Sequence, residues 1–150
     1  MRFEHDFSFS LLAPAGEAAS LLLAPERVFA RLPGIESLTR EGDELSGRVC
    51  GEALLFGRVC FPFKSRLRGD GGSEAVLEPL PLDEDLWAEL SGRGRAEGGE
   101  IRYRVKLVLH AQLPSGEKWG GKALVRMVEA AIRRSLERTL SSLPQRLEYR

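Results

Sequence analysis

Hydrophobic and polar residues alternate one by one at the start of the chain, a period of two that is typical of a half-buried β-strand. In the segment Arg2–Leu12 one face carries Phe3, His5, Phe7, Phe9 and Leu11. Two short helices are predicted next, from Pro14 through Leu23 and from Pro25 to about Leu32, since proline suits a first helical position. Pro33-Gly34 ends the pair.

Alternating segments separated by turn residues then predict six further strands. They cover residues 35–40, 45–55, 58–68, 74–79, 86–96 and 101–113. The last has the clearest pattern, with Tyr103, Val105 and Leu107 on the apolar face and arginines and a lysine on the other. Glycines 47, 51, 92 and 94 fall on the inward parity, where glycine relaxes packing or lets a sheet bend.

The segment Gly120–Leu143 has a helical period of 3.6 and is predicted to form one long amphipathic helix. The centre of its apolar stripe is small, with Ala131, Ser135 and Thr139 where leucine would fill more space. Either the helix lies very close to the sheet, or the small residues leave room for a ligand. The pattern does not choose between them.

The order of elements predicts an α+β fold of the helix-grip kind, in a single domain over residues 1–150. Consecutive strands joined by short turns form a curved antiparallel sheet of about seven strands. Two short helices follow the first strand, and the long C-terminal helix lies across the concave face.

The composition of the chain limits the classes of partner that it can attract. The chain has 22 basic and 22 acidic side chains, so no global field attracts nucleic acid or a membrane. There is no apolar run near the about 20 residues that a membrane span needs, and Met1–Asp6 is charged rather than signal-like. We therefore expect a cytoplasmic protein.

The two cysteines, Cys50 and Cys60, lie on adjacent predicted strands with the same parity, so they could approach one another across a hairpin. A cytosolic setting argues against a structural disulfide, and two thiols alone cannot make a tetrahedral zinc site. Free, buried or half-buried thiols are the prediction, with no metal and no cofactor.

The chain resembles the START-like (SRPBCC, polyketide cyclase-like) superfamily, and within it the carbon monoxide dehydrogenase G-like branch. The most specific stretch is Leu21–Asp43, LLLAPERVFARLPGIESLTREGD, with further similarity at Gly57, in Glu89–Gly94 and at Gly120-Gly121-Lys122. The resemblance implies a helix-grip domain that binds lipids, quinones, polyketides or similar apolar molecules. It carries no catalytic motif.

Apolar binding is therefore the leading hypothesis, in a cavity between the sheet and the C-terminal helix. The candidate ligand wall consists of Phe7, Phe9, Phe29, Leu32, Phe61, Phe63, Leu90, Tyr103, Val105 and Leu107, roofed by Val128, Ala131, Ser135 and Thr139. An aromatic-rich inner face also suits a plain core. A small cyclase or hydrolase using His5 or Tyr103 is a further alternative, although no partner residue is identifiable, and His110 has outward parity.

The outer face of the sheet is the rival feature. Its basic residues are Lys64, Arg66, Arg68, Arg93, Arg95, Arg102, Arg104 and Lys106. They predict either a solvated face with cross-strand ion pairs or an interaction module that docks on an anionic membrane or a partner protein. Exposed aromatic residues for stacking are scarce, so nucleic acid is disfavoured as a partner.

Overall fold

The computed structural model describes residues 2–14, 16–53, 57–69 and 73–112, with the isolated helical positions 126, 130, 133, 134 and 138 and the segment 146–148. The elements in chain order are β1 (Arg2–Leu12), α1 (Ala18–Leu22), α2 (Pro25–Phe29), β2 (Ile35–Glu41), β3 (Glu44–Ala53), β4 (Gly57–Gly69), β5 (Glu74–Leu80), β6 (Leu86–Glu97), β7 (Glu100–Ala111) and β8 (Arg146–Glu148).

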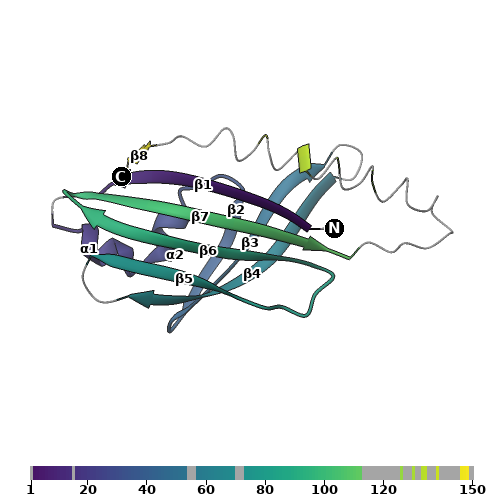
Figure 1. Ribbon diagram of the computed structural model, residues 1–150, viewed down its shortest axis with the longest axis horizontal. Coiled ribbons are helices and arrows are strands. Elements are labelled where there is room, and N and C mark those ends of the chain that lie inside the picture. The colour runs from purple at the N-terminus through teal and green to yellow at the C-terminus, as the bar shows by residue number, and fades with distance from the viewer. Residues whose placement is uncertain are drawn as a thin grey trace.

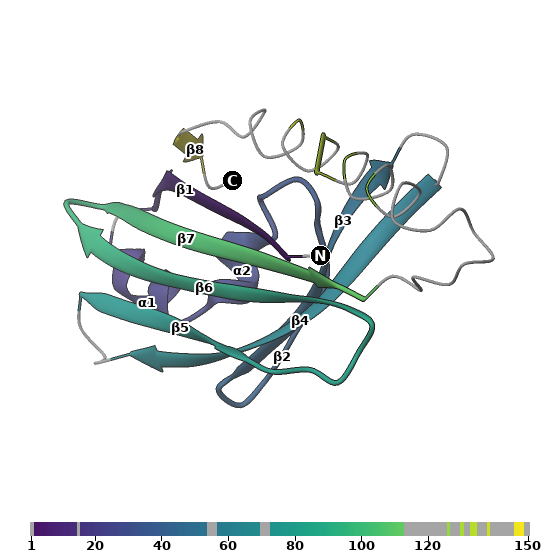
Figure 2. The same ribbon diagram turned by 45° about the vertical axis from the view of Figure 1, so that its right-hand side comes forward.

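These strands form one curved sheet in the order β2-β3-β4-β5-β6-β7-β1-β8. Strands β2 to β7 follow one another as an antiparallel meander, and β1 closes onto β7 in an antiparallel register that puts Phe9 opposite Tyr103. The sheet curls around α1 and α2, which lie together on its inner side (Figures 1 and 2). The predicted curved antiparallel sheet with two short helices after the first strand is confirmed.

The helices are shorter than predicted. Helix α1 begins at Ala18 rather than at Pro14, because Gly16 adopts a positive φ of 79° that a right-handed helix cannot include. Helix α2 begins at Pro25 as expected but ends at Phe29, and a tight turn follows in which the Leu32 amide donates to the Phe29 carbonyl.

The C-terminal part differs in part from the prediction. Most of the predicted helix Gly120–Leu143 lies outside the described residues; the five positions described there are helical and exposed. Strand β8 was not predicted, and it pairs in parallel with the end of β1, where Leu147 lies opposite Leu11. The sheet therefore has eight strands rather than about seven. Within the described part of the chain, no helix has the length and apolar character needed to cross a membrane.

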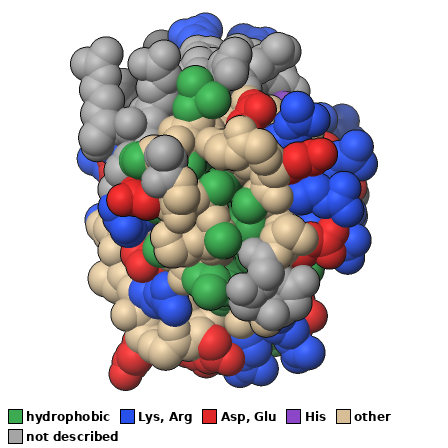
Figure 3. Space-filling model, turned by 90° about the vertical axis from the view of Figure 1, so that its left-hand side faces the viewer, with side chains coloured by type: hydrophobic (Ala, Val, Ile, Leu, Met, Phe, Trp, Pro, Cys, Tyr) green, Lys and Arg blue, Asp and Glu red, His purple; other side chains and the backbone are tan. Residues whose placement is uncertain are grey.

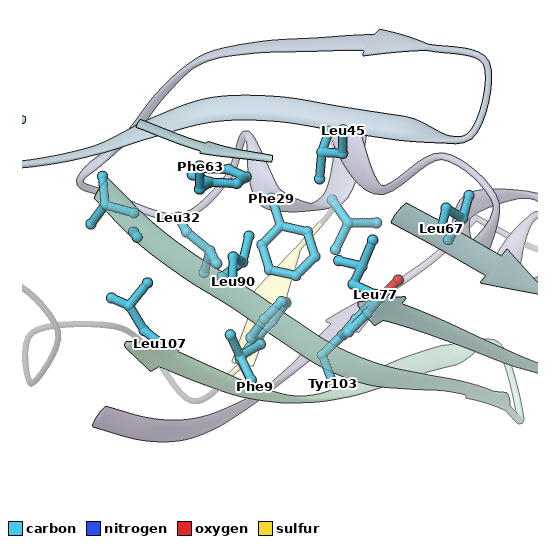
Figure 4. Packing of buried hydrophobic residues seen from close by; sticks show 14 of the residues in the cluster. Phe9, Phe29, Leu32, Leu45, Phe63, Leu67, Leu77, Leu90, Tyr103 and Leu107 are labelled. Atoms are coloured by element: carbon cyan, nitrogen blue, oxygen red, sulfur yellow. The ribbon is translucent and has the colours of Figure 1, made fainter. Parts of the chain in front are cut away.

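The core fills the inner side of the curved sheet. Side chains from β1, β3, β4, β5, β6 and β7 form one buried cluster with Leu21, Leu22, Val28 and Phe29 of the two helices. Figure 4 shows Phe29 among the strand residues of this cluster. Ser65 is fully buried within it, and its hydroxyl donates to the Leu90 carbonyl at 2.5 Å. This bond ties β4 to β6 close to the point where the two strands make direct contact at Phe63 and Ala88.

The prediction of free cysteines was wrong. Cys50 and Cys60 are directly opposite residues of β3 and β4, with Cα atoms 4.1 Å apart, and their sulfurs are joined as a disulfide. The shared parity of the two cysteines places their thiols together, but the expected cytosolic setting led to the wrong prediction of free thiols. The Glu36 carboxylate lies close to both sulfurs, but sulfurs bonded to each other are not available as metal ligands.

Candidate functional site

A row of aromatic rings runs along the inner face of β1. Its members, here called the aromatic row, are Phe3, His5, Phe7 and Phe9. Alternate residues of a strand share one face, so neighbouring rings lie 6.4, 5.9 and 6.2 Å apart between centroids. Phe3 and Phe9 at the ends are buried, whereas His5 and Phe7 in the middle are half-buried. The inner face is thus partly accessible along the centre of β1.

The buried end of the row continues into an aromatic cluster formed by Phe9, Phe29 and Tyr103. The Phe9 and Tyr103 rings stack at 5.6 Å because the two residues face each other across β1 and β7. Phe29 meets both rings edge-on, at 5.9 and 5.2 Å, from the last turn of α2. Such offset and edge-to-face arrangements suit the ring quadrupoles.

A glycine on β6 allows the Tyr103 ring to lie flat against the sheet. Gly94 is the cross-strand partner of Tyr103, and a Cβ atom at Gly94 would lie 2.5 Å from Cζ of Tyr103 and 2.8 Å from Cδ2 of Leu22. Phe63 covers Gly47 in the same way on β4 and β3. The space above these two glycines is therefore filled by an aromatic ring of the protein itself.

The Tyr103 hydroxyl is the unusual atom of this cluster. The residue is 1% exposed, and no hydrogen-bond partner for the hydroxyl lies among the residues that the structure describes. Burial raises the pKa of the Tyr103 phenol above its ordinary value of 10.0, and the Glu26 carboxylate on α2 raises it further. The hydroxyl therefore stays protonated at neutral pH and keeps one hydrogen to donate.

The structure brings most of the predicted ligand wall together. Phe9, Phe29, Leu32, Phe61, Phe63, Leu90, Tyr103, Val105 and Leu107 are all buried in one cluster, and Phe7 packs against it while half-buried. The predicted roof of Val128, Ala131, Ser135 and Thr139 lies outside the described residues. Because a packed core and a ligand wall both require this convergence, the binding role of these residues stays a prediction.

The two histidines lie on opposite faces of the sheet. His5 belongs to the aromatic row. His110 has the outward orientation that its parity predicts, with its Nε2 atom 2.8 Å from the Glu89 carboxylate and its ring stacked 4.2 Å from that of Trp87.

On the outer face, most of the predicted basic residues are paired. Lys64, Arg66 and Arg68 on β4 have acidic partners at nitrogen–oxygen distances from 3.0 to 3.7 Å. Figure 3 shows basic and acidic side chains interleaved along the right-hand margin of its view. The prediction of cross-strand ion pairs is therefore confirmed for this strand. Arg93 on β6 and Arg104 on β7 differ, because neither forms an ion pair within the described part of the chain.

A family model described as "Protein of unknown function (DUF3809)" matches residues 6–141 of the chain. The chain belongs to this family. No curated protein matches it.

Solved structures with a similar fold include START superfamily proteins and aromatase/cyclases. TTHA0849 from Thermus thermophilus is 19% identical over 92% of each chain, with a TM-score of 0.48. The Zhui aromatase/cyclase from Streptomyces sp. R1128 is 15% identical over 94% of this chain and 90% of that chain, with a TM-score of 0.47. A START superfamily protein from Mycobacterium smegmatis is 15% identical over 93% of this chain and 99% of that chain, with a TM-score of 0.43. Each of these TM-scores is below 0.5.

Proposed function

We propose that the protein binds an apolar small molecule with an oxygen acceptor, held against the inner face of the sheet and oriented by the Tyr103 hydroxyl. The observation that carries the proposal is this buried hydroxyl without a partner among the described residues, inside an aromatic cluster. A buried, unsatisfied hydroxyl costs about 1–3 kcal/mol, and phenylalanine would fill the same space without that cost. A ligand oxygen that accepts from the hydroxyl removes the penalty.

The aromatic row supplies the apolar part of the proposed site. The half-buried His5 and Phe7 adjoin the cluster at Phe9, so a flat molecule lying along β1 reaches toward Tyr103. Burial of its apolar surface contributes about 25 cal/mol per Å² before ordering costs are subtracted. Lipid, quinone and polyketide-like molecules all combine such a surface with carbonyl or hydroxyl oxygens.

One described residue of the C-terminal segment, Arg133, contacts the aromatic row. The guanidinium carbon of Arg133 lies 5.2 Å from the centroid of the Phe3 ring, at the end of the row remote from Tyr103. This cation–π contact places one exposed helical position beside the aromatic row. We infer that a ligand enters at the middle of β1, because His5 and Phe7 are the half-buried members of the row.

The raised pKa of Tyr103 favours hydrogen bonding over proton transfer, since a general base must lose its proton near the working pH. Binding is therefore preferred to the cyclase or hydrolase alternative, which no specific observation favours. The narrower resemblance to the carbon monoxide dehydrogenase G-like branch stays a prediction.

A matched pair of ligands tests the proposal. 2-Methyl-1,4-naphthoquinone and 2-methylnaphthalene share a ring skeleton and differ in two carbonyl oxygens, so the change in their affinity ratio between the wild type and Tyr103→Phe isolates the hydrogen bond. The preference for the quinone over the naphthalene is expected to be about five- to tenfold greater in the wild type than in Tyr103→Phe, as one hydrogen bond worth about 1 kcal/mol or slightly more predicts. An equal preference in the variant and the wild type would remove Tyr103 as the anchor.

A charge placed in the aromatic row tests the location. Phe7→Lys is expected to abolish binding of both naphthalene compounds, while Ser8→Lys, which adds the same charge on the opposite face of the same strand, should leave binding unchanged. Circular dichroism of both variants checks that they fold. Native mass spectrometry of the gently purified protein, followed by organic extraction, would identify any apolar molecule that travels with it. Unaltered binding by a folded Phe7→Lys variant would place the site elsewhere.

A further inference from the structure

Four arginines face one another in pairs on the outer side of β6 and β7. Arg93 lies directly opposite Arg104, and Arg95 lies directly opposite Arg102; together they are called here the arginine block. Like charges directly opposite each other in an antiparallel pair are destabilising. The next residue across the sheet from Arg104 is Ser8 on β1, which adds a hydroxyl to the same row.

Among the described residues, only one of the two pairs forms ion pairs with carboxylates. Arg95 forms an ion pair with Glu74 at 2.9 Å, and Arg102 lies 3.8 Å from Glu100. For Arg93 and Arg104 no ion pair or hydrogen bond occurs within the described part of the chain. Among the described residues, Arg93 and Arg104 are thus directly opposed arginines whose charges no ion pair compensates.

Two shallow grooves meet at this pair. One, of about 930 Å³, includes Arg95 and Arg102 in its lining, and the other, of about 740 Å³, includes Lys106. Both grooves are lined by Ser8, Arg93 and Arg104. Their carboxylates are Glu74, Glu97 and Glu100 in the first and Asp6 in the second. An anion at the junction therefore meets two guanidinium groups, with further cations on either side along β7.

We propose that the Arg93–Arg104 pair binds a compact anion made of linked phosphate groups, such as a di- or triphosphate chain. Guanidinium groups bind phosphate oxygens through two parallel hydrogen bonds, and the Ser8 hydroxyl offers another donor. Residues two apart on a strand are about 6.8 Å apart, so a phosphate chain extends from this pair to Lys106 or to Arg102. The site is independent of any ligand on the inner face.

The surrounding charges favour a compact anion over a bilayer. A membrane surface would also meet Lys64, Arg66 and Arg68, whose charges are already balanced by acidic neighbours. It would in addition meet the exposed carboxylates of Glu4 and Asp6 on β1. A compact anion is centred on the Arg93–Arg104 pair, away from the β4 ion pairs, and where it extends to Lys106 it competes with the Glu4 carboxylate, which lies 3.8 Å from that ammonium.

Isothermal titration calorimetry with inorganic tripolyphosphate tests this inference on the full chain. The wild-type protein is compared with Arg93→Gln/Arg104→Gln and with Arg66→Gln/Arg68→Gln, which removes the same charge from ion-paired arginines of the same face. All titrations use equal ionic strength, with inorganic orthophosphate as the single-phosphate reference. We expect the first variant to lose affinity at least about tenfold and the second to change less than about twofold.

Stability supplies a readout that a structural role would not produce. Removing two opposed charges should leave the melting temperature of Arg93→Gln/Arg104→Gln in low salt equal to or above that of the wild type. Equal loss of affinity in both variants would show a nonspecific field and overturn the proposal, as would absence of tripolyphosphate binding by the wild type. If the protein binds phosphatidylglycerol vesicles and tripolyphosphate does not release it, membrane docking would replace this proposal.

Discussion

Replacing Tyr103 with phenylalanine should stabilise the ligand-free protein. The substitution removes one oxygen and keeps the ring, including its contacts with Phe9 and Phe29. Because the hydroxyl is 1% exposed and has no partner among the described residues, its removal relieves a desolvation penalty of about 1–3 kcal/mol. In a domain of this size, each kcal/mol corresponds to a rise of about 2–4 °C in melting temperature.

The pH dependence of the same variant gives a second, independent measurement. The pKa of Tyr103 is raised in the folded state, so above the ordinary value of 10.0 the unfolded chain loses this proton first. The wild type therefore loses stability as the pH rises above that value, by up to about 1.4 kcal/mol per pH unit. Tyr103→Phe lacks this loss. The stability gap between the two proteins should widen with pH, since the other titrating groups are common to both.

Urea unfolding followed by far-ultraviolet circular dichroism measures both effects. Tyr103→Leu is the control, because it removes the aromatic ring together with the hydroxyl. Loss of the two aromatic contacts should lower the unfolding free energy by about 1–3 kcal/mol. If Tyr103→Phe were less stable than the wild type by more than about 0.5 kcal/mol at neutral pH, the hydroxyl would have a native partner. Tyr103 would then have no unsatisfied hydroxyl with which to anchor a ligand.

Three further substitutions probe the packing around the candidate site, each measured by the same unfolding assay. Gly94→Ala should lower stability by about 1–3 kcal/mol, because its Cβ would lie 2.5 Å from Cζ of Tyr103; no loss would mean that the ring moves freely. Ser65→Ala should cost about 1–2 kcal/mol through the lost bond to β6; a neutral result would show that another group satisfies that carbonyl. Cys50→Ser/Cys60→Ser should lower stability by about 2–3 kcal/mol, as closing a loop of sequence separation 10 predicts. Free thiols in the native protein, detected by alkylation, would contradict the disulfide.

The strands could be predicted because their burial is one-sided. In β7, every second residue from Ile101 to Leu109 is apolar, and a shift of one position would expose this entire set, so pattern and structure agree closely. Strand β8 lacks such a signal. Three residues are too few to show a period, and the pairing with β1 depends on where the chain returns after the C-terminal segment.

The direction of each side chain could also be predicted from the sequence, whereas its ion-pair and hydrogen-bond partners could not. Parity alone predicts that Tyr103 points inward and Arg104 outward, as the structure has them. That Arg104 faces Arg93 rather than a carboxylate follows from the register between β6 and β7, which alternation alone does not specify. That the Tyr103 hydroxyl has no partner among the described residues depends in turn on α2, whose Phe29 packs a ring against Tyr103 and whose Glu26 carboxylate raises the pKa of the phenol without forming a hydrogen bond to it. Charge balance and hydrogen-bond satisfaction are tertiary properties.

The structural features that support the two proposals both destabilise the ligand-free protein. A hydroxyl unpartnered among the described residues inside the sheet and an opposed arginine pair outside it both lower the stability of the free protein, and a ligand of complementary chemistry relieves each. Tyr103 and Arg104 are neighbours in β7 but point to opposite faces, so their ligands share no contact. A ligand at 100 times its dissociation constant stabilises by about 2.7 kcal/mol, and independent sites add. The naphthoquinone and tripolyphosphate should therefore raise the melting temperature additively; a shift with both ligands no larger than with one would mean that they compete for a single site.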